Sequence, residues 1–383
     1  MNYKIPLFLE IFTSLIQTPS ISSTIQTIDM SNKNFIDLLS NYFNDLDFFV
    51  KLYKVPHTIN KFNMLASKTV GNRGGLLLSG HTDTVPYDDN LWDSDPFILT
   101  NKNNKYYGLG VVDMKGFFAI VLETLKYICF KKLKRSIHIL ATADEETTMS
   151  GAIHFTNNTC LKPDCIIIGE PTSLIPVISH KGHMSISVMV KGQSGHSSNP
   201  SLGINSIDIM YDVISKLLQL RTFFKKKYMY NGFNINYPTL NLGKIYGGDS
   251  ANRICSSCTL LLDIRYTPNI DTKTINILIL KYLNPIINKW PQRLEIKKIH
   301  EDIPSYYYKH SNIFLKKIEN IVNKSSIYAD YCTEASFLQK IGPTIILGPG
   351  SINQAHQNNE FIDQSYISIT RNILWELINY FCL

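Results

Sequence analysis

The sequence contains no uninterrupted apolar stretch near the ~20 residues that a membrane-spanning helix needs. Its first residues also lack the apolar core and small-residue cleavage site of a secretory signal peptide. Basic residues are in slight excess, 38 Lys and Arg against 31 Asp and Glu, and they form no dense cluster of the kind that binds nucleic acid. These absences argue against a membrane or a nucleic acid as partner.

Cysteine is scarce and shows no pairing pattern. The seven cysteines are odd in number and scattered along the chain, which suits a reducing cytoplasm. Cys255 and Cys258 have the spacing of a zinc-binding pair, but no second such pair accompanies them. They also lie in a strand-like run, where an offset of three places side chains on opposite faces. We therefore predict a cytoplasmic protein without a structural zinc site.

At 383 residues the chain is longer than one ordinary core, so we expect two domains. Residues 1–52 show helical periodicity, clearest at 8–16 and 34–43. Four short apolar runs, interleaved with helical stretches such as 116–130, read as buried strands: 75–79, 136–142, 165–169 and 343–348. This pattern predicts an α/β fold with a mostly parallel sheet flanked by helices.

The pattern changes between residues 181 and 294. Three strand-like segments stand there, at 184–190, 239–246 and 257–266, with helical stretches at 203–221 and 272–283. They predict a small α+β domain with an antiparallel sheet, inserted into the larger domain. The predicted catalytic domain is therefore 1–180 together with 295–383, and the insert is 181–294.

Potential metal ligands and acid/base groups stand beside the predicted strands and the helical stretch at 116–130. In chain order they are His81, Asp113, Glu145, Glu146, Glu170 and His356. His81, the glutamate pair and Glu170 each come just after a strand, and His356 follows the fourth strand by a short loop. Ligands of open α/β sheets bind at the carboxyl ends of the strands, so we expect these side chains to converge.

The residue types indicate a pair of divalent ions. Imidazole nitrogens and carboxylate oxygens in this number give each ion about three protein ligands. One carboxylate that bridges both ions holds them about 3.5–4 Å apart, as in aminopeptidases and related hydrolases. A neighbouring carboxylate can then carry a proton from water to the leaving nitrogen. Asp83, two residues after His81, is expected to orient the imidazole.

Each motif also has an ordinary explanation. His81 and Asp83 alone could form a turn, adjacent glutamates could begin a solvated helix, and Asp113 could cap one. The Gly-Glu-Pro segment could be a turn, and His356 a surface histidine. His196, in a Gly- and Ser-rich turn, could donate to an oxyanion, but alone it would be an ordinary loop histidine. The explanations for the metal motifs would all have to hold together, which favours the hydrolase prediction.

Together the motifs resemble those of the dinuclear zinc amidohydrolases and exopeptidases, over essentially the whole chain. The resemblance implies a zinc-exopeptidase-like fold with an inserted lid and dimerisation domain. The first implied ion has the ligands His81, Asp113 and Glu170, and the second has Glu146, Asp113 and His356. Glu145 would be the general base, with Asp83 supporting His81. The resemblance also implies a homodimer in which His196 reaches the other subunit's site. Zinc is the implied metal, and deacetylases of the family are also associated with cobalt and with glutathione as an additive.

Within that family, the segments 108–110, 331–335 and 347–357 are most similar to those of members that act on N2-acetyl-L-ornithine. The resemblance implies hydrolysis of this small N-acylated amino acid to ornithine and acetate, in arginine synthesis. By the same similarity, Asn252, Arg253 and Arg265 are candidates for binding the substrate carboxylate, although Arg265 could equally be a surface charge. The alternatives are a desuccinylase for succinyl-diaminopimelate, a dipeptidase, and a catalytically silent binding protein on this scaffold.

Overall fold

The computed structural model describes residues 5–71, 74–310 and 312–383. The chain forms two compact units. The first unit comprises Met1–Ile178, Tyr308–Ile327 and Thr333–Leu383, and the second comprises Ser179–Tyr307 and Tyr328–Cys332. The predicted insert boundary at 294 falls at the start of β12 (Leu294–Lys298), which pairs with β9 in the second unit.

The first unit is built on a large sheet with the strand order β1-β2-β6-β3-β7-β15-β8. The central neighbours β6, β3, β7 and β15 are parallel, whereas β1, β2 and β8 run antiparallel to their neighbours. The strands are β1 (Phe49–Lys54), β2 (Phe62–Lys68), β3 (Gly75–His81), β6 (Ser136–Thr142), β7 (Cys165–Pro171), β8 (Val177–His180) and β15 (Thr344–Gly348). The predicted α/β class with a mostly parallel sheet is confirmed.

One part of the helical prediction for residues 1–52 is wrong. Helices α1 (Phe8–Ile16) and α2 (Lys33–Asp45) form as expected, but residues 49–52 begin strand β1. In this segment apolar and polar side chains alternate at Val50, Lys51 and Leu52, a two-residue period that suits a strand. Residues 1–4 lie outside the described part of the chain.

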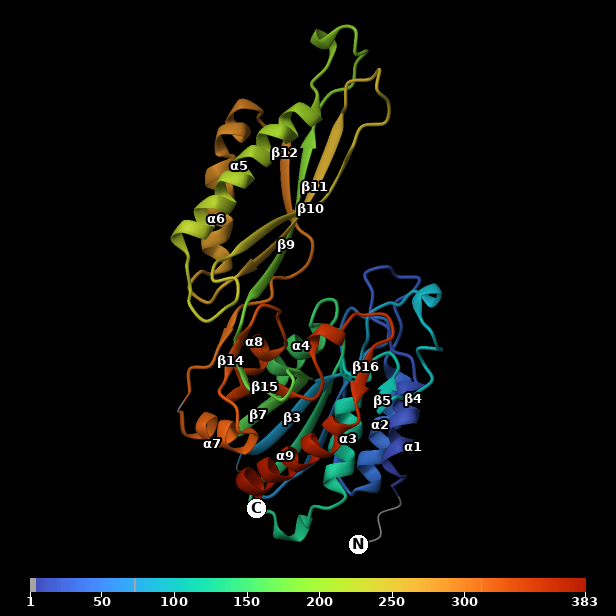
Figure 1. The fold of residues 1–383 in the computed structure, drawn as a ribbon. Helices are drawn as coiled ribbons and strands as arrows, with labels where there is room; N and C mark the ends of the chain where they lie inside the picture. Colours follow the sequence, from blue (N-terminus) through green and yellow to red (C-terminus); the bar gives the residue numbers. More distant parts are fainter. Residues whose placement is uncertain (1–4, 72–73, 311) are drawn as a thin grey trace. The chain divides into compact units, whose positions relative to one another are not determined.

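Helices cover both faces of the large sheet. The chain passes from β3 through α3 (Lys115–Leu125) to β6, and from β6 through α4 (Ser150–Asn158) to β7. These two connections move along the sheet in opposite directions, so right-handed crossovers place α3 and α4 on opposite faces. Helices α1 and α9 (Ser365–Cys382) pack against α3, whereas α8 (Ala335–Leu338) packs against α4 (Figure 1). Because it is covered on both faces, β3 has every residue buried.

A small sheet joins two loops that are distant in sequence. Its strand order is β16-β5-β4, with bounds β4 (Thr100–Lys102), β5 (Lys105–Tyr107) and β16 (Phe361–Asp363). Phe361 pairs with Tyr107. The segment that precedes β16 and the segment that follows β5 therefore lie side by side. These two segments carry His356 and Asp113.

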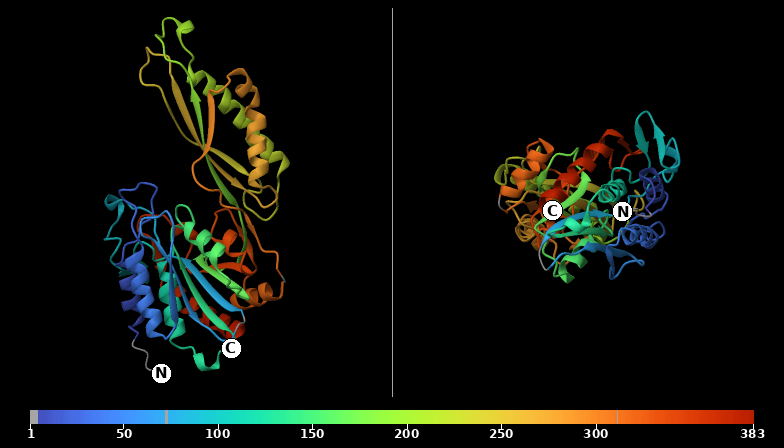
Figure 2. Two further views of the ribbon diagram at one scale, coloured as in Figure 1. Left: turned by 180° about the vertical axis from the view of Figure 1, so that it is seen from behind. Right: turned by 90° about the horizontal axis from the view of Figure 1, so that it is seen from below.

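The second unit is an antiparallel sheet with two long helices on one face (Figures 1 and 2). The strand order is β10-β11-β9-β12, with β9 (Gly182–Lys191), β10 (Thr239–Gly247) and β11 (Ser257–Tyr266). Alternate residues of β9, from Met184 to Val190, are buried against α5 (Ser206–Lys227) and α6 (Thr272–Lys289). Helix α7 (Asn312–Val322) belongs to the first unit, and the short strands β13 (Tyr306–Tyr307) and β14 (Ile327–Ala329) both pair with β8. None of the helices in the described ranges has the length and apolarity that crossing a bilayer requires.

Candidate metal centre

The predicted ligands lie at one edge of the large sheet, where parallel strands of the first unit end. His81 is the last residue of β3, Glu170 lies at the end of β7, and Glu145 and Glu146 follow the end of β6. These three strands are parallel neighbours, so their carboxyl ends meet at the same edge. The small sheet brings the segments of Asp113 and His356 together.

Asp113 turns one carboxylate oxygen toward each histidine. Its Oδ1 lies 2.9 Å from Nε2 of His81, and its Oδ2 lies 3.5 Å from Nε2 of His356. The remaining contacts extend the cluster on both sides. Nε2 of His81 is 3.8 Å from Oε1 of Glu170, and Nε2 of His356 is 2.9 Å from Oε2 of Glu146. A carboxylate placed in this way can bridge two cations.

Two overlapping groups of side chains have ligand atoms close enough to hold an ion. One is His81, Asp113 and Glu146, and the other is His81, Glu145 and Glu170, with all ligand atoms of a group within 4.8 Å of one another. The first group contains the central carboxylate of Asp113. The second contains Glu145, so this glutamate lies near enough to serve either as a ligand or as a base beside a bound ion.

The buried carboxyl groups repel one another. Burial and the charge of Glu170 raise the pKa of Glu145 well above its usual range, and burial raises that of Glu170 likewise. Burial alone would lower the pKa of His81, but the hydrogen bond to Asp113 and the nearby carboxylates raise it well above normal. The hydrogen bond to Glu146 raises the pKa of His356 to about 9.

These shifts show an excess of negative charge that protons or cations must balance. In addition, Oε1 of Glu146 is buried and has no hydrogen-bond partner among the described residues. The mixture of imidazole and carboxylate donors therefore fits divalent metal ions.

Asp83 supports the centre differently from the prediction. Nδ1 of His81 lies 2.9 Å from the backbone carbonyl of Asp83 but 3.8 Å from its carboxylate. A carbonyl can only accept, so Nδ1 carries a proton and Nε2, which faces Asp113, is the nitrogen that could bind an ion after losing its proton. The carboxylate of Asp83 instead accepts the backbone N–H groups of Glu145 and Glu146, at 3.2 and 3.1 Å. The side chain therefore holds the glutamate pair, and the backbone orients the histidine.

Sequence reasoning missed Glu360, which holds the segment that carries Asp113. Its buried carboxylate accepts N–H groups from Gly110, Val112 and Asp113 at 3.0, 2.7 and 3.0 Å. Burial raises the pKa of Glu360 to about 8. Nothing in its local sequence indicates this contact, because the three donors lie about 250 residues earlier.

A second buried glutamate, Glu334, was also missed. Its Oε2 accepts a hydrogen bond of 2.8 Å from the hydroxyl of Thr142, and its Oε1 has no partner within the described ranges. Burial raises the pKa of Glu334 to about 7. The segment 331–335 was noted as a family resemblance, but that resemblance assigned no role to this residue.

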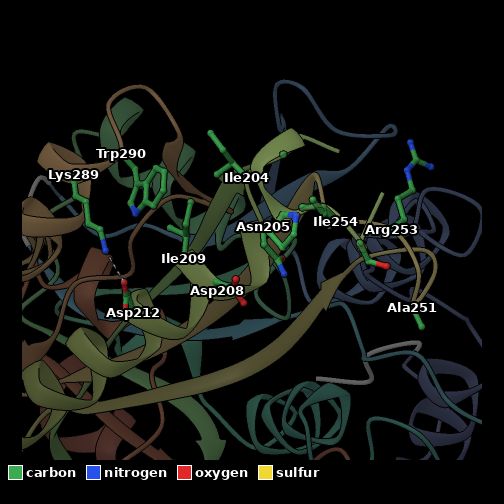
Figure 3. Close-up of a pocket in the computed structure, with 13 residues that line it drawn as sticks. Ile204, Asn205, Asp208, Ile209, Asp212, Ala251, Arg253, Ile254, Lys289 and Trp290 are labelled. Carbon is green, nitrogen blue, oxygen red and sulfur yellow. Dashed lines mark ion pairs between the residues drawn. The ribbon is translucent and has the colours of Figure 1, made fainter. Parts of the chain in front are cut away.

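Three of the predicted oxyanion- and substrate-binding residues lie together in the second unit. His196 forms a β-bridge with Arg253, and the N–H of Ser197 donates to the carbonyl of Asn252 at 3.1 Å. Arg253 also lines a cavity of about 440 Å³, whose walls include Asn205, Asp208 and Trp290 (Figure 3). None of the metal-centre side chains lines this cavity.

Arg265 does not join that group. It lies eight residues beyond Ser257, the first residue of β11, or about 26 Å along the strand. Its guanidinium contacts Asp263 at 3.2 Å and the sulfur of Cys332 at 3.6 Å. Within one copy of the chain, Arg265 and Arg253 therefore stand at opposite ends of β11.

The fold and the centre together define a metal-dependent amide hydrolase. The sequence profile of peptidase family M20/M25/M40 matches residues 77–380, and the chain belongs to this family. It is 55% identical over 382 residues to an acetylornithine deacetylase of Buchnera aphidicola subsp. Acyrthosiphon pisum (strain APS), covering 100% of both chains. An acetylornithine deacetylase of Shigella sonnei (strain Ss046) is 50% identical, again with 100% of both chains covered.

Solved structures share the fold at low sequence identity. A family M20 metallo-carboxypeptidase from Sulfolobus solfataricus has a TM-score of 0.76 and 20% identity, covering 98% of this chain and 99% of that one. A tripeptidase from Staphylococcus aureus has a TM-score of 0.75 and 21% identity, covering 97% of each. A dinuclear metal-binding peptidase of the same family from Bacillus subtilis has a TM-score of 0.66 and 13% identity, covering 98% of this chain and 97% of that one.

Proposed function

We propose that this chain hydrolyses N2-acetyl-L-ornithine to L-ornithine and acetate, as a step of arginine biosynthesis. The full-length identity of 50–55% to relatives named acetylornithine deacetylase supports this substrate. The observation that carries the hydrolase chemistry is the placement of Asp113, with one carboxylate oxygen toward His81 and the other toward His356.

In this proposal His81, Asp113 and Glu170 hold one divalent ion, and Glu146, Asp113 and His356 hold the other. Zinc is the expected metal, and cobalt is an alternative with similar ligand preferences. Bound ions of this kind polarise an amide carbonyl and acidify a water molecule.

Glu145 is the proposed base. It takes the proton of the attacking water and delivers it to the leaving nitrogen of ornithine. Burial raises the pKa of Glu145, which suits a carboxylate that must first gain and then release a proton. The carboxylate of Asp83 keeps the backbone of this glutamate in place.

We further propose that the active form is a homodimer in which His196 of a second copy supports the oxyanion. Asn252 and Arg253 lie beside His196 and would enter the site with it, whereas Arg265 would act from the opposite end of β11. A guanidinium binds a carboxylate through two parallel hydrogen bonds, which suits the substrate's α-carboxylate. The proposed location is the cytoplasm. All seven cysteines are free of disulfides, as a reducing compartment requires.

The test is a substrate panel with the purified, metal-loaded protein, with and without glutathione. N2-acetyl-L-ornithine, succinyl-diaminopimelate and a set of dipeptides are compared by kcat/KM. A clear preference for acetylornithine is expected, and a preference for the succinyl substrate or a dipeptide would overturn the substrate assignment. Turnover of the Glu145→Ala variant distinguishes an enzyme from a silent binding protein, because only an enzyme loses turnover when its base is removed. The control is Glu376→Ala, which changes an exposed glutamate of α9. Equal turnover in both variants would refute the role of Glu145.

A further inference from the structure

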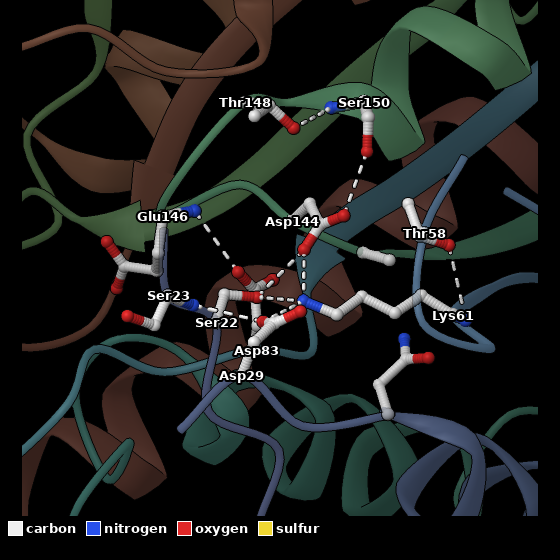
Figure 4. Close-up of polar contacts among 12 residues, drawn as sticks. Ser22, Ser23, Asp29, Thr58, Lys61, Asp83, Asp144, Glu146, Thr148 and Ser150 are labelled. Atoms are coloured by element: carbon white, nitrogen blue, oxygen red, sulfur yellow. Dashed lines mark hydrogen bonds and ion pairs between the residues drawn. The ribbon is translucent and has the colours of Figure 1, made fainter. Parts of the chain in front are cut away.

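A buried lysine lies next to the loop that carries Glu145 and Glu146, and the proposed chemistry does not use it. Lys61 directly precedes β2, and its side chain is only 2% exposed. Its ammonium group forms an ion pair with Asp144 and contacts Oδ1 of Asp29 at 2.6 Å and the hydroxyl of Ser22 at 2.9 Å (Figure 4). A buried charge is costly unless it is paired, so the ammonium group of Lys61 depends on these three partners to remain buried.

Lys61 acts on the residue immediately before Glu145. Asp144 has a φ of 60°, in the left-handed region, which residues other than glycine adopt uncommonly, although aspartate does so more readily than most. Oδ2 of Asp144 accepts from the hydroxyl of Ser150 at 3.0 Å, and Oδ1 accepts from the hydroxyl of Ser22 at 3.0 Å. Lys61 and Ser22 contact Oδ1 of Asp144, and Ser150 contacts Oδ2, so both carboxylate oxygens are bound. These contacts fix the residue from which the chain continues to Glu145.

Lys61 also balances the charge of a second carboxylate. Asp83, which accepts the N–H groups of Glu145 and Glu146, is 1% exposed and is repelled by Asp144. Lys61 remains charged despite its burial, because Asp144 and Asp29 raise the pKa of its ammonium group. Its positive charge also attracts the nearby carboxylate of Asp83.

The neighbouring residue Asn63 contacts the same loop. Side chains two residues apart in an extended segment point the same way, so Lys61 and Asn63 face one side of β2. Oδ1 of Asn63 accepts from the N–H of Ala143 at 3.1 Å, and its Nδ2 donates to the carbonyl of Gly151 at 2.8 Å. Asn63 thus binds both ends of the loop 143–151, and Lys61 binds the same loop at Asp144.

We propose that Lys61 is a positioning residue for the metal centre. Its ammonium group, acting through Asp144 and Asp83, fixes the places of the base Glu145 and the ligand Glu146. The inference rests on the roles proposed for these two glutamates. Under the simpler alternative, Lys61 is a buried ion pair that stabilises the fold and leaves the metal centre unaffected.

The test compares Lys61→Met, which keeps the length of the side chain and removes its charge, with Lys181→Met. Lys181 is a matched control, because it is also 2% exposed and pairs with Asp330 at 2.8 Å in the second unit. Zinc affinity of the metal-free protein, the visible spectrum of the cobalt form, and kcat and KM for acetylornithine are measured. Lys61→Met should lose roughly 10- to 100-fold in zinc affinity or kcat and show an altered cobalt spectrum. Lys181→Met should match the wild type in affinity and spectrum.

A folded Lys61→Met protein with wild-type zinc affinity, cobalt spectrum and kcat would overturn the proposal. If this variant does not fold, Asp144→Asn takes its place, since it keeps the shape of the partner and removes its charge. A wild-type cobalt spectrum and zinc affinity in Asp144→Asn would then be the refuting result. The metal measurements need no substrate. A wild type that binds zinc but does not hydrolyse acetylornithine would refute the proposed function and leave this test intact.

Discussion

Replacing Glu360 with alanine should loosen the segment that carries Asp113. The change leaves the buried N–H groups of Gly110, Val112 and Asp113 without their acceptor. Each buried donor left unpaired costs about 1–3 kcal/mol, so the loss is about 3–9 kcal/mol in total. Removing a carboxyl group whose pKa is raised to about 8 by burial offsets part of this cost. We therefore expect the lower end, about 3 kcal/mol.

The assay is native-state hydrogen exchange of the metal-free protein, followed by mass spectrometry of peptides that cover residues 108–114. A loss of about 3 kcal/mol in local stability should speed exchange there by about 100-fold. Glu360→Gln keeps one carbonyl oxygen and should be intermediate, and Glu376→Ala serves as a surface control. Unchanged exchange at 108–114 in Glu360→Ala would show that the carboxylate does not hold this segment.

Three further predictions concern the base, the metal and a core histidine. Glu145→Gln should keep the metal content of the wild type and lose roughly 10²- to 10⁴-fold in turnover, and a small loss would assign the base elsewhere. A chelator should abolish hydrolysis, and zinc or cobalt should restore it; full activity in the metal-free protein would contradict the metal assignment. Burial lowers the pKa of His138 to about 4, so the unfolded chain binds its proton more tightly. Stability should therefore fall as the pH drops from 6.5 toward 4, by about 2 kcal/mol between pH 7 and 5 from this residue. His138→Val should remove this part of the slope in urea unfolding at the two pH values, and an unchanged slope would refute it.

Local sequence patterns were sufficient to predict those metal-centre residues that stand at the ends of apolar strands. His81 and Glu170 could be found because each stands at the end of a continuous apolar run, and parallel strands bring such ends together. The predicted strand at 136–142 is β6, in which His138 is buried. The strand at 49–54 was missed, because the amphipathic helices that precede it dominated the pattern.

The supporting residues could not be found in this way. Lys61 and Glu360 are single charged residues in ordinary polar surroundings, and their partners lie 83 and about 250 residues away. Only the tertiary structure makes these side chains buried and paired. The same holds for Asp83, since backbone geometry decides whether its carbonyl or its carboxylate faces His81.

The position of β15 has a consequence for synthesis of the chain on the ribosome. This strand lies between β7 and β8, yet it is made after the entire second unit. At about 5–20 residues per second, the interval between β7 and β15 lasts roughly 10–35 seconds. During that time the apolar strand Cys165–Pro171 presents an open edge to which other nascent chains can pair. The split arrangement thus makes the newborn polypeptide dependent on protection from aggregation until β15, close to the end of the chain, has emerged.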